Sequence, residues 1–291
     1  MGSHFGPVLP ALEAIAPAET ARAASASARA FGVKFGLRVN DAAVLPALLG
    51  RLPPGAHVSQ KPSADALQYL VTKHTGSADN ASGDAWQIYA GAQLEAETAD
   101  ADEALEAFEG LVRFGVALNA PRWTFVHAGA VGWKGRAILI PGTSQSGKSH
   151  LVEAMVRLGA TYYSDEFAVL DRRGRLFPYT QPLALRRASG GIDRVTAEQL
   201  GGTRATGPLP VGLIVSTHFV AGATWSPEPI SAGAAVLALL QHTVRAQLDS
   251  ARVLKVLAAT VANALALDSP RGEAGATAAA LLHHADDTIQ P

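Results

Sequence analysis

The sequence predicts an α/β protein in which a smaller α+β domain precedes a larger domain built around a strand–loop–helix unit. Short apolar segments alternate with segments whose apolar residues have helical spacing, and this mixture is typical of a three-layer α/β domain. A glycine-rich loop directly follows one buried strand and precedes a helix. Because the pattern changes near Asn119, we expect the N-terminal α+β domain over residues 7–118 and the second domain over residues 119–291.

The composition excludes several classes of protein. Hydrophobic residues make up 48% and charged residues 17% of the 291 residues, which excludes disorder as the default state. The 24 basic residues are balanced by 25 acidic ones. We therefore expect no nucleic-acid partner, since nucleic-acid-binding proteins need an excess of cations. The absence of cysteine excludes a disulfide scaffold, a zinc–thiolate site and an iron–sulfur cluster, and it fits a cytoplasmic protein.

We expect neither a membrane segment nor a targeting signal. The apolar stretch 253–267 is interrupted by Lys255 and Asn263, and it is shorter than the roughly 20 residues that cross a bilayer. The start of the chain lacks the basic region of a signal peptide. Residues 1–6 resemble the remnant of an expression tag, and we assign them no role.

The N-terminal domain has patterns for strands and helices but no chemical motif. The alanine-rich residues 7–30 predict one or two short helices or a partly ordered arm. A helix over 42–52 is expected after the capping residue Asp41. Apolar residues on one face predict an amphipathic helix over 102–118. Alternating apolar residues predict a strand at 31–38. Strands are also expected at 67–73 and 86–90, with a polar surface loop at 75–84 between them, and 93–98 is expected to pair back through a turn at Gly91 and Ala92.

The second domain is predicted as strands mixed with helices. Lys134 and Gly135 form a turn between two strands, Gly159 ends a helix, and Ser231 caps another. Apolar segments predict strands at 122–133, 137–140, 161–164, 167–170, 176–179, 211–217 and 265–268. Helices are predicted at 150–158, 231–245, 251–262 and 273–284.

The glycine-rich loop carries the main chemical motif, because it matches G-x-x-x-x-G-K-[ST] at every position. Its glycines allow backbone N–H groups to turn inward around an anion, and the following helix adds its positive N-terminus. Lys148 would contact the β- and γ-phosphates of ATP, and Ser149 would bind Mg²⁺. The alternative, a glycine- and serine-rich turn without a ligand, is disfavoured by the flanking strand and helix. The expected nucleotide-binding residues are Gly142, Thr143, Ser144, Gln145, Ser146, Gly147, Lys148, Ser149 and His150.

Two acidic residues and one histidine are further candidates. Asp165 and Glu166 directly follow the predicted strand 161–164, where a carboxylate would face the phosphates. One carboxylate could hold the metal through water, and the other could orient or deprotonate an attacking hydroxyl. The alternative for this pair is a solvated strand end. His127 lies between apolar residues, where a core histidine is the alternative to a catalytic group.

These motifs, in this order, resemble the HPr kinase/phosphorylase superfamily. The most specific segments are HAGAV at 127–131, GTSQSGKS at 142–149 and GATYYSDE at 159–166. Within the superfamily, the chain is most similar to HPr-kinase-like proteins, some of which phosphorylate lasso-peptide precursors. The resemblance extends over about 124–187, and residues before it match no part of HPr kinase.

The resemblance implies a P-loop kinase domain of the HPr kinase/PEP carboxykinase type, with MgATP as the phosphoryl donor. It implies that Asp165 is the general base, that Glu166 lies beside the metal, and that His127 is the active-site histidine. Two differences from the family pattern concern the reaction. Gln145 replaces the middle glycine of the family loop, and the acidic–Val-Arg-Gly signature associated with phosphorolysis is absent. The reverse reaction is therefore not expected.

The sequence leaves three functional hypotheses. The first is a kinase that transfers the γ-phosphoryl group to a serine- or threonine-type hydroxyl of a peptide or protein, with Asp165, His127, Lys148 and Glu166 as catalytic residues and Ser149 and Glu166 at the metal. The second is a regulator that binds the nucleotide without transfer. The third is a small-molecule kinase. A homo-oligomer is possible, since members of the superfamily form oligomers.

Overall fold

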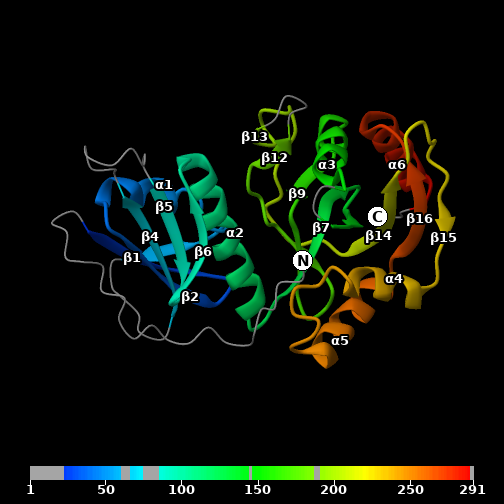
Figure 1. Ribbon diagram of the computed structural model, residues 1–291. Coiled ribbons are helices and arrows are strands. Elements are labelled where there is room, and N and C mark those ends of the chain that lie inside the picture. Colours follow the sequence, from blue (N-terminus) through cyan, green and yellow to red (C-terminus); the bar gives the residue numbers. More distant parts are fainter. Residues whose placement is uncertain (1–22, 60–65, 75–84, 144–145, 187–190, 289–291) are drawn as a thin grey trace. The chain divides into compact units, whose positions relative to one another are not determined.

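The computed structural model describes residues 23–59, 66–74, 85–143, 146–186 and 191–288 (Figure 1). The expected tag remnant at 1–6 and the expected surface loop at 75–84 lie outside the described residues. The chain divides into two compact units, residues 1–121 and 122–291. Among the described helices, none is long and apolar enough to cross a membrane.

The first unit is a six-stranded sheet with helices. The strand order is β3-β1-β2-β4-β5-β6, in which β2 and β4 are parallel and the other pairs are antiparallel. The strands are β1 (Ala24–Ala30), β2 (Val33–Val39), β3 (His57–Ser59), β4 (Leu67–His74), β5 (Ala85–Ala90) and β6 (Gln93–Thr98). The helices are η1 (Ala42–Val44), α1 (Leu45–Leu49) and α2 (Ala101–Asn119).

The core of this unit lies between the sheet and α2. The ring of Tyr69 on β4 makes edge contacts with Phe35 of β2 and Phe108 of α2, each at 6.3 Å between centroids. Asp100 caps α2 by accepting a hydrogen bond from the Glu103 backbone at 2.8 Å. The predictions for β4, β5, β6 and α2 are confirmed. The predicted helix 42–52 is shorter and starts with a 3-10 turn capped by Asp41.

The helix expected within residues 7–30 is wrong for residues 24–30, which form β1. Ala26, Ala28 and Ala30 are buried, as is Ser27 between them, and the strand pairs along its whole length with β2. Alanine favours helices in isolation, but pairing with a strand that buries Phe35 overrides this weak preference.

The second unit is a mixed α/β structure around one large sheet, so the predicted α/β class is confirmed. The strand order is β11-β10-β7-β8-β14-β16-β15, and β9 also pairs with β7. Strands β8, β14 and β16 are parallel to one another. The strands are β7 (Thr124–Trp133), β8 (Arg136–Pro141), β9 (Thr161–Ser164), β10 (Phe167–Leu170), β11 (Leu176–Phe177), β14 (Val211–Phe219), β15 (Glu228–Pro229) and β16 (Leu265–Arg271).

Helices cover both faces of this sheet (Figure 1). They are α3 (Lys148–Arg157), α4 (Ala232–Leu240), α5 (Ser250–Val261) and α6 (Ala274–Thr288). One core joins Ile138 and Ile140 of β8 to α3 and α6. A second core joins Leu139 of β8 to α4 and α5. The alternation of these three residues across β8 therefore produces a helix–sheet–helix arrangement.

Several details differ from the predictions. A two-stranded sheet of β12 (Leu183–Arg186) and β13 (Ile192–Val195) was not expected. Helix α4 ends at Leu240 instead of 245, because the next residues attach to β7: the His127 backbone N–H donates to the His242 carbonyl at 2.7 Å. Strand β16 continues to Arg271, three residues past the predicted end, because it pairs with β14 up to Phe219.

Candidate functional site

The glycine-rich loop connects the end of β8 to the start of α3. Gly147 has a φ of +81° and is the N-cap of α3, which has no side-chain cap. A Cβ atom at this position would also contact the guanidinium of Arg271. The loop therefore requires glycine here, and the first N–H groups of α3 have no capping side chain. Ser144 and Gln145, both predicted nucleotide-binding residues, lie outside the described residues.

Lys148 is buried at the start of α3. Its Nζ donates a hydrogen bond to the Thr143 carbonyl at 2.5 Å and lies 3.4 Å from Nε2 of His127. Burial lowers the pKa of Lys148, while the negative charges of Glu166 and Asp165 raise it. The ammonium group is thus held at the loop, with two carboxylates nearby. The ammonium group could bind an anion, and the carboxylates could bind a cation that accompanies it.

Asp165 is a buried carboxylate, with 6% of its surface exposed. It accepts hydrogen bonds from the Tyr162 hydroxyl at 2.9 Å and from the Ala184 backbone at 3.3 Å, and the nearby Ser149 hydroxyl also favours its ionised form. Burial raises the pKa of Asp165, and the hydroxyls of Ser149 and Tyr162 oppose this shift. The structure therefore joins the carboxylate to the last residue of the loop motif.

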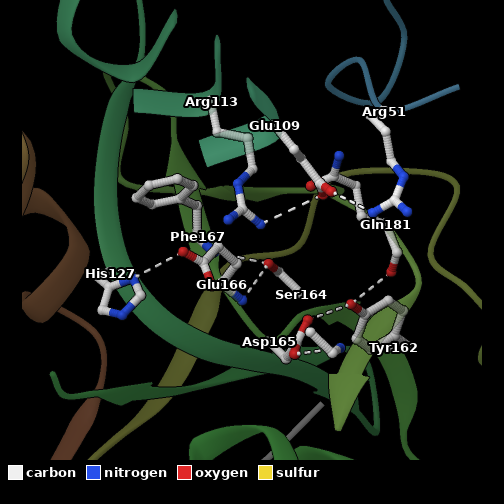
Figure 2. Close-up of polar contacts among 11 residues, drawn as sticks. Arg51, Glu109, Arg113, His127, Tyr162, Ser164, Asp165, Glu166, Phe167 and Gln181 are labelled. Atoms are coloured by element: carbon white, nitrogen blue, oxygen red, sulfur yellow. Dashed lines mark hydrogen bonds and ion pairs between the residues drawn. The ribbon is translucent and has the colours of Figure 1, made fainter. Parts of the chain in front are cut away.

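Glu166 points in a different direction from Asp165 (Figure 2). Its Oε1 lies 3.6 Å from Nδ1 of His127, and its side chain is 32% exposed. The Ser164 hydroxyl accepts hydrogen bonds from the backbones of Glu166 and Phe167 at 3.0 and 2.9 Å. This tight turn between β9 and β10 separates the two carboxylates, one facing inward and one facing His127 (Figure 2).

A cavity of about 640 Å³ lies beside the loop. It is formed at the carboxyl ends of β8, β14 and β16, which meet at one edge because the three strands are parallel. The predicted residues His150, Gly142, Thr143, Ser146 and Gly147 line it. The cavity is also lined by Pro141, Ser216, Thr217, His218, Phe219, Ala238, Gln241, His242, Arg271, Glu273 and Ala274.

The structure thus brings most of the predicted residues to one edge of the sheet. Lys148 contacts His127, His127 contacts Glu166, and Ser149 contacts Asp165. Sequence reasoning did not identify Tyr162 or Arg271 as part of this region. Tyr162 could have been identified from the sequence, because it lies three residues before Asp165 in the predicted buried strand 161–164. Arg271 could have been identified as a basic residue that lies shortly after the predicted strand 265–268.

The oxygen atoms present suit a magnesium ion. The Ser149 hydroxyl and the Asp165 carboxylate are adjacent, and hard oxygen donors of this kind are the ligands that Mg²⁺ prefers. Within the described ranges, no group of three or more His, Cys, Asp or Glu residues could hold a metal ion. Mg²⁺ is commonly held by one or two protein ligands together with substrate phosphates, and the residues here fit that arrangement.

Comparisons with known proteins give little further information. No protein-family model matches the chain, and no curated protein matches it. Among solved structures, the chain is similar to the HPr(Ser) kinase/phosphatase from Coxiella burnetii, with 15% sequence identity and a TM-score of 0.32. The match covers 56% of this chain and 97% of that chain.

Proposed function

We propose that the protein is an ATP-dependent kinase that transfers the γ-phosphoryl group to a serine- or threonine-type hydroxyl of a peptide or protein. The observation that carries the proposal is that the Ser149 hydroxyl lies near the buried carboxylate of Asp165 and lowers its pKa. This proximity joins a strand–loop–helix motif suited to phosphates to a buried carboxylate on a different element. A glycine-rich turn without a ligand would not require a buried carboxylate such as Asp165 beside it.

Lys148 and the N-terminus of α3 would bind the phosphates. Lys148 exchanges its hydrogen bond with the Thr143 carbonyl for the β- and γ-phosphate oxygens. Ser149 and Asp165 would hold Mg²⁺, which when bound neutralises charge on the phosphates. The inward direction and burial of Asp165 favour this role over that of general base, the role that the resemblance implies.

Glu166 is the better placed group for accepting a proton. It is partly exposed and can meet a hydroxyl that approaches from solvent, whereas Asp165 is buried and hydrogen-bonded to Tyr162 and Ala184. The hydroxyl oxygen attacks the γ-phosphorus while its proton passes to Glu166, and the bond to the β-phosphate oxygen breaks to release ADP. His127 orients Glu166 and lies between it and Lys148.

The test is phosphoryl transfer from γ-labelled ATP with Mg²⁺ to a library of peptides containing serine and threonine. Glu166→Gln should abolish transfer and retain MgATP binding. Asp165→Asn should weaken the dependence of ATP binding on Mg²⁺. Glu198→Gln is a matched control, because this exposed glutamate pairs with Arg204 at 3.3 Å in a surface ion pair.

Three results would contradict the proposal. Label that reaches no peptide, although MgATP binds, would favour a nucleotide-binding regulator. Label found only on small alcohols would favour a small-molecule kinase. Transfer at the parent rate by Glu166→Gln would show that Glu166 is not the base.

A further inference from the structure

The large cavity lies on one side of the loop, and the acidic pair lies on the other. In the sheet, β8 has β7 as one neighbour and β14 as the other, with β16 beyond. The turn that carries Asp165 and Glu166 follows β9, which pairs with β7. The cavity instead lies at the ends of β14 and β16. A nucleotide whose phosphates occupy the loop would therefore have its acceptor on the β7 side and space for its remaining part on the β14 side.

Arg271 connects this cavity to the loop. It ends β16, is only 4% exposed, and donates from Nη2 to the Ser146 carbonyl at 2.5 Å and from Nη1 to the Gly272 carbonyl at 3.3 Å. Its Nε has no hydrogen-bond partner. Burial lowers the pKa of Arg271, and the carboxylate of Glu273, which lines the same cavity, raises it without forming an ion pair among the described residues. A buried cation usually has a charged partner, so this guanidinium can interact with a ligand that carries an electron-rich group such as an aromatic ring.

Phe219 gives the cavity an aromatic wall. It ends β14 opposite Arg271 in the strand register, and 53% of its surface is exposed, although most large apolar side chains of this sheet are buried. The Arg271 guanidinium carbon lies 5.6 Å from the centroid of the Phe219 ring. A planar cation over an aromatic ring, both lining one cavity, forms a surface on which a flat heteroaromatic ring can stack.

We propose that this cavity binds the nucleoside part of the nucleotide, with the base stacked against the Arg271–Phe219 pair. Its volume of about 640 Å³ falls in the range of small-ligand sites. This inference rests on the proposed function for the phosphates, and it adds a second, separable binding element. The hydrogen bond from Arg271 to Ser146 makes Arg271 a positioning residue as well, since it holds the loop against the nucleoside cavity.

The test compares two probes that differ only by the nucleoside: MgATP and magnesium tripolyphosphate, titrated calorimetrically into the full chain. The wild-type protein should bind MgATP at least about tenfold more tightly than tripolyphosphate. Phe219→Ala should weaken MgATP binding about tenfold and leave tripolyphosphate binding unchanged, because base–aromatic stacking contributes on the order of a tenfold change. Phe219→Trp should restore MgATP binding. Leu254→Ala, which shortens an exposed apolar side chain on α5, should change neither affinity.

The outcomes separate this inference from the proposed function. Equal binding of both probes, or an equal loss of both in Phe219→Ala, would overturn the nucleoside site and leave the phosphate site intact. Binding of MgATP that depends on Phe219, without transfer to any hydroxyl, would support the nucleoside site and contradict the kinase. Failure of both probes to bind would overturn both.

Discussion

The Ser149 hydroxyl lies near the Asp165 carboxylate and lowers its pKa, although the two residues come from different elements of the second unit. Ser149 lies in the first turn of α3, and Asp165 follows β9. The two residues meet because β9 pairs antiparallel with β7, and β7 pairs antiparallel with β8. The carboxyl ends of β8 and β9 therefore lie at the same edge of the sheet.

Lys148→Ala should weaken MgATP binding at least about tenfold and lower phosphoryl transfer by about 10²–10³-fold, because the variant lacks the cation at the loop. The fold should survive, since burial already lowers the pKa of this lysine and disfavours its charge. Calorimetry and a thermal melt measure the two effects. Lys255→Ala, on the exposed side of α5, is the control, and an equal effect in that variant would contradict a role specific to the loop.

Asp165→Asn should become more stabilising relative to the wild type as the pH rises above 3.8. Burial raises the folded-state pKa of Asp165 above the unfolded value of 3.8. The folded protein then binds more protons than the unfolded chain between these two values, so the contribution of Asp165 to stability falls with rising pH. The variant has no such group, and thermal melts of the ligand-free protein across this range measure the difference.

Asp171→Asn is the matched control, because its effect on stability should change with pH in the opposite direction. Burial raises the pKa of Asp171, but hydrogen bonds from the Arg175 backbone and guanidinium outweigh it and lower the pKa. Ionised Asp171 therefore stabilises the fold above pH 3.8, and this contribution is lost as the pH falls through the lower folded value. The variant should lose more stability at neutral than at acid pH. Parallel pH trends in the two variants would contradict both assignments.

Tyr162→Phe should lower stability and move the titration of Asp165 to higher pH. The Tyr162 hydroxyl lies 2.9 Å from Oδ1 of Asp165 and 2.8 Å from the Gln181 carbonyl (Figure 2). Removing it takes away the one hydroxyl proton that these two acceptors share, at a cost of about 1–3 kcal/mol, or a Tm lower by about 2–8 °C. The pH dependence of MgATP binding measures the second effect, because the lost hydrogen bond favours the ionised carboxylate.

Tyr163→Phe provides the control for this prediction. The Tyr163 hydroxyl donates to the Gly207 carbonyl at 2.7 Å and makes no hydrogen bond with Asp165. Its removal should lower the Tm without moving the pH dependence. A shift of the same size in both variants would show that the pH effect is not due to the hydrogen bond with Asp165.

Gly147→Ala should lower both stability and MgATP affinity. Gly147 has a left-handed backbone, which costs an L-residue about 1–2 kcal/mol, and the added methyl group would displace the buried Arg271 guanidinium. Gly159 also has a positive φ, of +99°, but a Cβ there meets no atom within 4 Å. Gly159→Ala should therefore lower the Tm by a few degrees and leave binding unchanged. Unchanged binding in Gly147→Ala would contradict the link between the loop and Arg271.

Local patterns were sufficient to predict most elements of the fold. Strands were expected at the positions of β4, β5 and β6, and the spacing of apolar residues identified α2. These patterns gave wrong predictions where contacts with distant segments of the chain override a weak local preference for helix or strand. Alanines 26, 28 and 30 became a strand because β2 pairs with them, and α4 stopped early because His242 bonds to β7.

The amino-acid order alone identified the strand–loop–helix unit, the acidic pair and His127, because these signals lie within a few consecutive residues and depend on local backbone geometry. It left open which carboxylate meets Ser149, and it did not indicate Arg271. Those relationships required the fold: Arg271 and Ser146 are 125 positions apart and meet because β8, β14 and β16 run parallel to one edge. Contacts between distant segments depend on the order of the strands in the sheet. Local sequence patterns do not determine that order.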